Sequence, residues 1–156
     1  MISTDREPRE DAEFDEFYRT HRVPMTRLAV LLIDRRSEAD EVVQEAFAAV
    51  HQRWSDLDTP PAYLRRVVVN RCHDVLRRRR HRREVVIEEQ PVAPPSGDDL
   101  RDVIASLPAK QRTVIVLRYY EDLSIESIAD LTGMPTGTVK SALHRALAQL
   151  RLVVER

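Results

Sequence analysis

Residues 60–83 constrain the fold of this chain more than any other stretch, because their spacing predicts one long helix with two different faces. Successive residues of an α-helix lie about 100° apart, which sorts the side chains into an apolar stripe and an opposite polar face. The apolar stripe comprises Leu64, Val67, Val68, Cys72 and Val75. The polar face carries Arg66, Asn70, His73, Arg77 and Arg80. We expect the first face to pack on a core and the second to meet a negatively charged partner.

The two ends of this helix are specified differently. Thr59 can cap the first turn and Pro60 fits only there, so the start is well defined. The arginines at positions 77–80 repel one another and would fray the last turn unless an anionic partner neutralises them. An arginine run alone is equally consistent with a solvated helix end. Asn70 and Asp74 favour a more specific role, because a short amide and an acid among cations suit the reading of base edges.

Composition favours helices and excludes several classes of protein. Among the 156 residues only 3 are glycine and 33% are charged, and the single cysteine, Cys72, excludes an internal disulfide and suits a reducing cytosol. The net charge of −1 hides a strong local separation, because acids cluster in residues 5–16 and 84–99 with arginines between them. No stretch approaches the roughly 20 apolar residues of a membrane span, and the acidic start is unlike a signal peptide. We therefore expect a cytoplasmic protein without membrane insertion.

The first half of the sequence predicts a helical domain over residues 11–83, preceded by a disordered segment at 1–10. Apolar residues recur at helical spacing up to Leu32, and Pro24 is expected to kink or divide that segment. A second helix should start at a Ser37 cap. Its outer surface carries Asp40, Glu41, Gln44 and Glu45. Spacing alone favours a helix-dipole role for these acids over a docking surface for a basic partner.

An acidic, proline-containing linker is predicted at residues 84–98, and a second helical domain at 99–156. In that domain a short helix capped by Ser124 is followed by Gly133 and Thr136, which suit a turn and a new helix start. This is the pattern of a helix-turn-helix. The longer helix turns small, polar and cationic side chains outward, as a helix in a DNA major groove must. An ordinary helical hairpin with a polar surface is the alternative.

Longer motifs in both halves are similar to one known family. The segment LPAKQRTVIVLRYYEDLSIESIADLTGMPTGTVKSALHRAL closely resembles region 4 of bacterial sigma-70-type factors of the extracytoplasmic-function (ECF) group. EADEVVQEAFAAV resembles their region 2.2, and WSDLDTPPAYLRRVVVNRCHDVLRR resembles their regions 2.3 and 2.4. The order of these motifs matches the family, and details of the sequence favour its actinobacterial branch. The resemblance implies an all-α fold of two small helical domains, region 2 and region 4, joined by a flexible linker.

The resemblance also implies roles for particular residues of an alternative sigma factor, which binds core RNA polymerase and directs it to promoters. The residues implied in polymerase docking are Asp40, Val43, Gln44, Glu45 and Phe47, which revises the preference from spacing alone. Those implied in binding and melting the −10 element are Arg66, Asn70, His73, Asp74, Arg77, Arg78 and Arg80. Those implied at the −35 element are Thr136, Thr138, Lys140, Ser141, His144 and Arg145. Core RNA polymerase and promoter DNA are the implied partners and an anti-sigma factor is a further one, whereas no cofactor, metal or small-molecule substrate is implied.

The sequence departs from the family pattern in three places. Asp40 and Glu41 reverse the usual acidic order, which should be nearly silent. Pro135 stands where a small polar residue is commoner, and Ala142 replaces a usual arginine, so one phosphate contact is expected to be missing.

Two other functions compete with this one. A stand-alone helix-turn-helix transcriptional regulator is the main alternative, but the sequence offers no dimerisation zipper or effector-binding segment. An enzyme is disfavoured because the five histidines are scattered and the acids lie on helix exteriors or in the linker.

Overall fold

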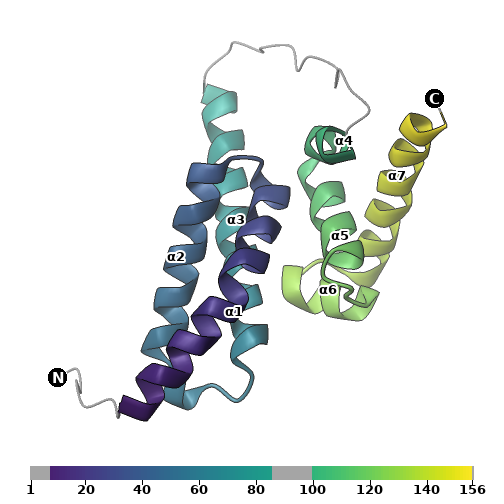
Figure 1. Cartoon of the computed structure of the whole chain (residues 1–156). Helices are drawn as coiled ribbons and strands as arrows, with labels where there is room; N and C mark the ends of the chain where they lie inside the picture. The colour runs from purple at the N-terminus through teal and green to yellow at the C-terminus, as the bar shows by residue number, and fades with distance from the viewer. Residues whose placement is uncertain (1–7, 86–99, 156) are drawn as a thin grey trace.

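The computed structural model describes residues 8–85 and 100–155, and this part of the chain is built from helices without any strand (Figure 1). The first half contains α1 (Pro8–Ile33), α2 (Arg36–Gln52), the short 3₁₀ helix η1 (Trp54–Asp56) and α3 (Pro60–Val85). The second half contains α4 (Leu100–Ser106), α5 (Ala109–Tyr119), α6 (Ile125–Thr132) and α7 (Thr136–Val154). The prediction of an all-α fold is confirmed.

The first bundle is formed by α1, α2 and α3, which pack against one another around an apolar core. Its fully buried side chains include Leu28 and Leu32 of α1, Val43 of α2, and Leu64 and Val68 of α3. An aromatic cluster closes one end of the bundle. Its rings belong to Phe14, Phe17, Phe47 and Trp54. The inward face of α3 contains Leu64, Val68 and Cys72 of the predicted apolar stripe, and it also contains Val69, which the predicted stripe lacks.

Several predicted helix boundaries are wrong by a few residues. The segment 1–10 was expected to be disordered, but α1 begins at Pro8, and residues 1–7 lie outside the described part. Pro24 does not divide α1, which runs unbroken through it. Pro24 is exposed and so is Thr20, whose carbonyl loses its helical donor, so water can replace that donor without ending the helix.

Helix α2 starts before its predicted cap, and α3 ends after its predicted end. The residue that precedes α2 is Arg35, which makes no side-chain cap, so Ser37 lies inside the first turn. The start of α3 at Pro60 is confirmed, but the helix continues past the arginines to Val85 and includes the first two residues of the predicted linker. The rest of the predicted linker, residues 86–98, lies outside the described residues.

The second bundle contains the predicted helix-turn-helix in α6 and α7. The Ser124 side chain accepts a hydrogen bond from the backbone N–H of Ser127 at 3.1 Å, and Gly133 closes α6 in the left-handed conformation with φ of 74°. Both features confirm the sequence prediction. Thr136 is the first residue of α7 rather than its cap, and Pro135 holds the cap position with its carbonyl accepting from Val139 N–H.

The two bundles pack against each other in the described structure. Helix α1 contacts α4 and α5, and α3 contacts α6. Figure 1 shows α4–α7 standing beside the first bundle, so α3 has α2 on one flank and the second bundle on another. Buried residues of both halves belong to one continuous cluster.

Candidate nucleic-acid interface

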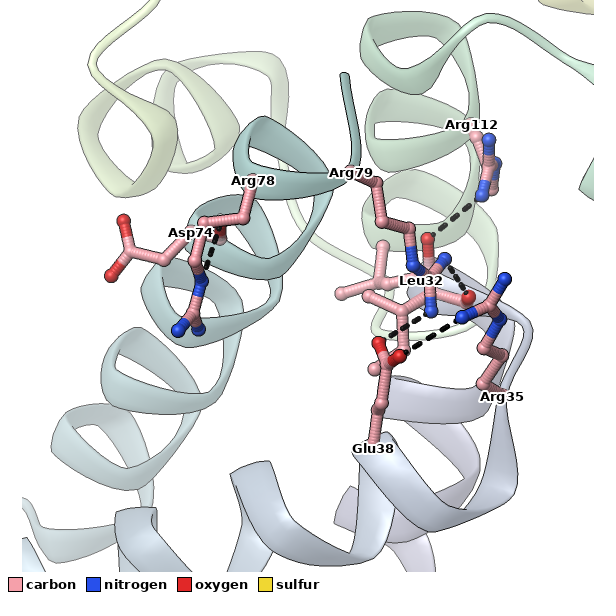
Figure 2. Close-up of polar contacts among 8 residues, drawn as sticks. Leu32, Arg35, Glu38, Asp74, Arg78, Arg79 and Arg112 are labelled. Atoms are coloured by element: carbon pink, nitrogen blue, oxygen red, sulfur yellow. Dashed lines mark hydrogen bonds and ion pairs between the residues drawn. The ribbon is translucent and has the colours of Figure 1, made fainter. Parts of the chain in front are cut away.

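Helix α3 exposes a strongly cationic surface. The exposed side chains on it are Arg66, Asn70, Arg71, Arg77, Arg78, Arg80, His81 and Arg82. Asp74 lies among them, with its carboxylate 3.4 Å from Arg77, and its backbone carbonyl accepts from Arg78 (Figure 2). Exposed pairs of this kind contribute little to stability, so Asp74 can exchange Arg77 for another partner at low cost. Except for His73, the residues assigned to the −10 element therefore share an accessible face.

His73 does not lie on the exposed face of α3 to which the sequence assigned it. Its side chain is partly buried, and its Nε2 lies 3.4 Å from the Thr113 hydroxyl of α5, which is itself 1% exposed. Burial and then the neighbouring charge of Arg77 lower the pKa of His73, which favours the neutral imidazole. The cause lies outside α3, because the second bundle packs on the flank of the helix where His73 lies. Spacing within one helix cannot reveal such a neighbour.

Helix α7 presents the second polar face. Thr136, Lys140, Ser141, His144 and Arg145 are exposed and Thr138 is partly so, while Val139 and Ala146 are buried against the other helices of the second bundle. The face is made of short polar groups and cations, as direct reading of base edges requires. The outward orientation of these six side chains agrees with the prediction.

Ala142 requires a different explanation from the one that the sequence suggested. Its side chain is only 7% exposed and lies on the packed side of α7. An arginine here would have to leave the bundle interior before it could reach a phosphate. The alanine at this position therefore serves helix packing, and it removes no side chain from the outer face.

The outer surface of α2 is acidic and accessible, but two of the five residues assigned to polymerase docking are not on it. Asp40, Gln44 and Glu45 are exposed, whereas Val43 and Phe47 are 1% and 3% exposed and pack in the core. In this structure the side chains of Val43 and Phe47 are therefore not accessible to a partner. Both residues instead hold α2 in place, because their apolar side chains are removed from water between the helices.

The exposed residues of α2 have neighbours that spacing did not reveal. Gln44 donates to the hydroxyl of Tyr18 at 3.0 Å, and Glu45 lies 3.6 Å from Arg71 of α3. A polar groove runs between the two helices. It is lined by Glu38, Glu41, Val42 and Glu45 of α2 and by Arg71, Val75, Arg78, Arg79 and Arg82 of α3. The acidic and cationic surfaces of the first bundle thus meet along one line.

The loop before α3 is held by a contact that the sequence did not signal. The Arg53 guanidinium stacks over the Tyr63 ring at 5.1 Å, which ties the end of α2 to the first turn of α3. Ser55, Asp58 and Thr59, in the intervening segment, remain exposed. A fixed loop with free polar side chains at the start of a cationic helix can receive an unstacked base.

The described residues give little support to metal binding, membrane insertion or thiol chemistry. Among them no group of three or more histidine, cysteine or carboxylate side chains could hold a metal ion. No described helix is both long enough and apolar enough to cross a bilayer. Cys72 is buried, and burial raises the pKa of its thiol to about 12, so it remains protonated and packs as an apolar group.

Two family matches cover most of the chain. Residues 17–82 match Sigma-70 region 2, and residues 97–150 match Sigma-70, region 4. The RNA polymerase sigma-E factor of Streptomyces coelicolor is 39% identical over 149 residues, which cover 89% of this chain and 84% of that protein. The ECF RNA polymerase sigma factor SigM of Mycobacterium tuberculosis is 32% identical, with 88% of this chain and 74% of that protein covered.

Solved structures agree with the fold. The sigma factor RpoE in complex with the anti-sigma factor NepR from Bartonella quintana matches with a TM-score of 0.72 at 19% identity, covering 92% of this chain and 97% of that one. CnrH in complex with the cytosolic domain of CnrY matches with a TM-score of 0.64 at 22% identity, covering 93% and 89%. The chain has two helical bundles in the order of the family's regions, and each bundle exposes a cationic helix face. Its relatives match it over most of their length. The chain belongs to the ECF group of the sigma-70 family, as a sigma factor that directs RNA polymerase to promoters.

Proposed function

We propose that the exposed face of α3 binds and opens the −10 element, and that the exposed face of α7 reads the −35 element. The observation that carries the proposal is the position of Asn70 and Asp74, which lie on the accessible side of α3 among arginines. Phosphate attraction alone would be served by cations only. An amide and a carboxylate at this place can hydrogen-bond the edge of a base.

Strand opening follows from binding a base outside the duplex. Extruding a base costs a few kcal/mol of stacking and pairing, and contacts made only to the extruded base offset that cost. Asn70, Asp74 and the exposed loop before α3 would supply these contacts. The surrounding arginines would hold the phosphates on either side. They are Arg66, Arg77, Arg78 and Arg80.

In the second bundle, α7 takes the role of the recognition helix of a helix-turn-helix. The exposed side chains of Thr136, Ser141, His144 and Arg145, with the partly exposed Thr138, would contact base edges. Lys140 would contact the phosphate backbone. Pro135 is compatible with this role, because it sits at the cap of α7 with φ of −59° and leaves the outer face unchanged.

Docking on core RNA polymerase would use the exposed acids of α2. Asp40 and Glu45 are each paired with an arginine of this chain only through exposed contacts at 3.5 and 3.6 Å. A basic polymerase surface can displace such arginines at little cost. The complex of a structural relative with the anti-sigma factor NepR supports an anti-sigma protein as a further partner. These partners would place the activity on the chromosome in the cytoplasm.

Reconstituted transcription tests the proposal. The chain with core polymerase should give specific starts and open the −10 region, detected by permanganate reactivity of unpaired thymines, whereas the chain alone should bind promoters weakly. Asn70→Ala with Asp74→Ala should abolish opening while the holoenzyme still assembles. Asp15→Ala with Gln149→Ala, also exposed helical positions, is the matched control and should open promoters normally. Normal opening by the Asn70 and Asp74 variant would refute the assignment.

A further inference from the structure

The polar groove between α2 and α3 is lined by two facing rows of charged side chains. The acids of the α2 row are Glu38, Glu41 and Glu45, and the arginines of the α3 row are Arg71, Arg78, Arg79 and Arg82. The residues of each row share one face of their helix, as their spacing requires. Val42 and Val75 are the apolar residues of the lining. The groove thus offers anionic, apolar and cationic groups side by side.

Two ion pairs join the rows and fix their register. The pairs are Glu38 with Arg79 at 2.6 Å and Glu45 with Arg71 at 3.6 Å. Because the lower-numbered acid pairs with the higher-numbered arginine, α2 and α3 run antiparallel along the groove. Glu41 is near the middle of the acid row, and Val75 is midway between the two paired arginines. Glu41 and Val75 therefore lie at about the same level of the groove, between the two pairs.

Three side chains of the groove keep binding capacity that the described residues do not use. Arg78, Arg82 and Glu41 are exposed, and within the described part of the chain none of them has an oppositely charged group at ion-pair distance. The Nε of Arg78 contacts the Asp74 carbonyl at 3.4 Å, which leaves its two Nη groups available (Figure 2). Arg78 and Arg82 are four residues apart, so they are neighbours on the helix surface and repel each other. A bound anion would remove this repulsion.

These groups match the parts of a nucleotide. Guanidiniums donate paired hydrogen bonds to phosphate oxygens, so Arg78 and Arg82 suit a phosphate. Glu41 on the opposite wall would repel a bare anion, but its carboxylate accepts hydrogen bonds from N–H or O–H groups of a base or sugar. Val75 lies about five residues before the middle of the arginine pair, or about 7.5 Å along the helix, which is close to the length of one nucleoside. One molecule can therefore reach both ends.

The size of the groove limits the ligand. Its volume is about 220 Å³, which is below the roughly 300–1,000 Å³ of sites that enclose a drug-sized molecule. A single nucleotide that stays partly in water fits this space, whereas a longer segment would extend beyond it. The 2.6 Å pair of Glu38 with Arg79 holds the two walls together, so the site is formed before a ligand arrives.

We propose that the groove between α2 and α3 binds a single nucleotide, with its phosphate on Arg78 and Arg82 and a donor group of its base or sugar on Glu41. The site goes beyond the proposed promoter and polymerase contacts, in which Arg82 and Glu41 have no assigned part. Arg78 is also assigned to phosphates of the −10 element. The nucleotide is therefore either a free one or a unit of the displaced DNA strand, and both sources carry the same chemistry.

Equilibrium dialysis of the full-length chain at low salt tests the site, with labelled guanosine 5′-monophosphate and labelled inorganic phosphate as separate probes. The nucleotide should bind more tightly, because only the nucleotide reaches Glu41 and Val75. Arg82→Gln should weaken binding of both probes about tenfold, because one charge-assisted contact to phosphate is lost. Glu41→Gln should weaken binding of the nucleotide about fivefold and leave binding of phosphate no weaker, because the lost carboxylate accepts from the nucleoside but repels phosphate.

Matched controls show whether these effects belong to the groove. Arg22→Gln and Glu126→Gln replace the same residue types at exposed positions outside the groove, and neither should change the affinity for either probe. Simple attraction of anions to a cationic helix would make Glu41→Gln strengthen binding of both probes, and that result would overturn the site. Equal binding of the nucleotide and phosphate to the unaltered chain would overturn it as well.

Competition in the same assay identifies the source of the nucleotide. A single-stranded oligonucleotide with the non-template −10 sequence should displace the labelled nucleotide if the displaced strand occupies the groove. It should leave the nucleotide bound if a free nucleotide is the ligand. Either result supports the site once the Glu41→Gln and Arg82→Gln effects are observed. Because the free chain is measured, failure of the promoter roles of Asn70 and Asp74 would not alter these results.

Discussion

The Nη2 of Arg79 in α3 lies 2.6 Å from the Oε2 of Glu38 in α2, and the same guanidinium donates to the Ile33 carbonyl at the end of α1. One side chain therefore joins all three helices of the first bundle (Figure 2). Burial alone would raise the pKa of Glu38, but the guanidiniums of Arg79 and Arg35 hold it below its ordinary value. The pair fixes α3 relative to the acidic helix α2, and so positions the two surfaces assigned to polymerase and DNA.

Replacing Glu38 by alanine should lower the free energy of unfolding by about 2 kcal/mol, because Arg79 would keep a largely buried charge without its acidic partner. Urea denaturation measures this effect. Asp40→Ala is the matched control, because its pair with Arg36 is exposed at both ends and should contribute less than about 0.5 kcal/mol. Equal effects of the two substitutions would contradict the structural role of Glu38.

The pH dependence of stability should contain a contribution from His73. Burial and the charge of Arg77 lower the pKa of His73 in the folded chain from its ordinary value of 6.5. The unfolded chain then binds the proton more readily, so stability is complete above pH 6.5 and decreases as the pH falls through the lower folded pKa. His73→Gln should lose this part of the dependence. The measurement is the free energy of unfolding of both proteins between pH 7.5 and about 5.5. If the His73→Gln variant lost as much stability as the parent over this range, the expected contribution of His73 would be contradicted.

Local sequence chemistry predicted the helices well and their neighbours poorly. Pro60 and Gly133 sit where expected because each acts through its own backbone, and the two faces of α3 follow from helical spacing. The burial of His73 and the capping of α1 by Arg112 depend on residues 40 and 80 positions away in the chain. No periodicity within one helix carries that information. The assignment of Val43 to a partner had a similar cause, because resemblance identifies a docking helix but not which of its side chains face outward.

The distinction between Val43 and the exposed acids of α2 can be measured. Asp40→Ala with Glu45→Ala should weaken binding to core polymerase by at least about tenfold while changing the free energy of unfolding by less than about 1 kcal/mol. Val43→Ala should leave the affinity for polymerase unchanged but lower the free energy of unfolding by about 2 kcal/mol, because it leaves a cavity in the core. Polymerase affinity is measured by fluorescence anisotropy at a temperature where both variants are folded. A direct role of Val43 would be supported if its substitution weakened binding in fully folded protein.

The two kinds of contact proposed for α7 should differ in their salt dependence. Arg145 and Lys140 are both exposed cations on this helix, but only Arg145 is assigned to a base edge. Lys140→Ala should weaken binding of the holoenzyme to all −35 sequences alike, and should reduce the slope of log affinity against log salt by about 0.9, because one phosphate contact is lost. Arg145→Ala should cost about 1–3 kcal/mol on the preferred sequence and less on sequences altered at its base pair, because it loses discrimination as well as charge. Holoenzyme binding to a panel of −35 variants at several salt concentrations separates the two effects. If both substitutions changed the affinity for every sequence equally, α7 would hold the DNA backbone without reading its bases.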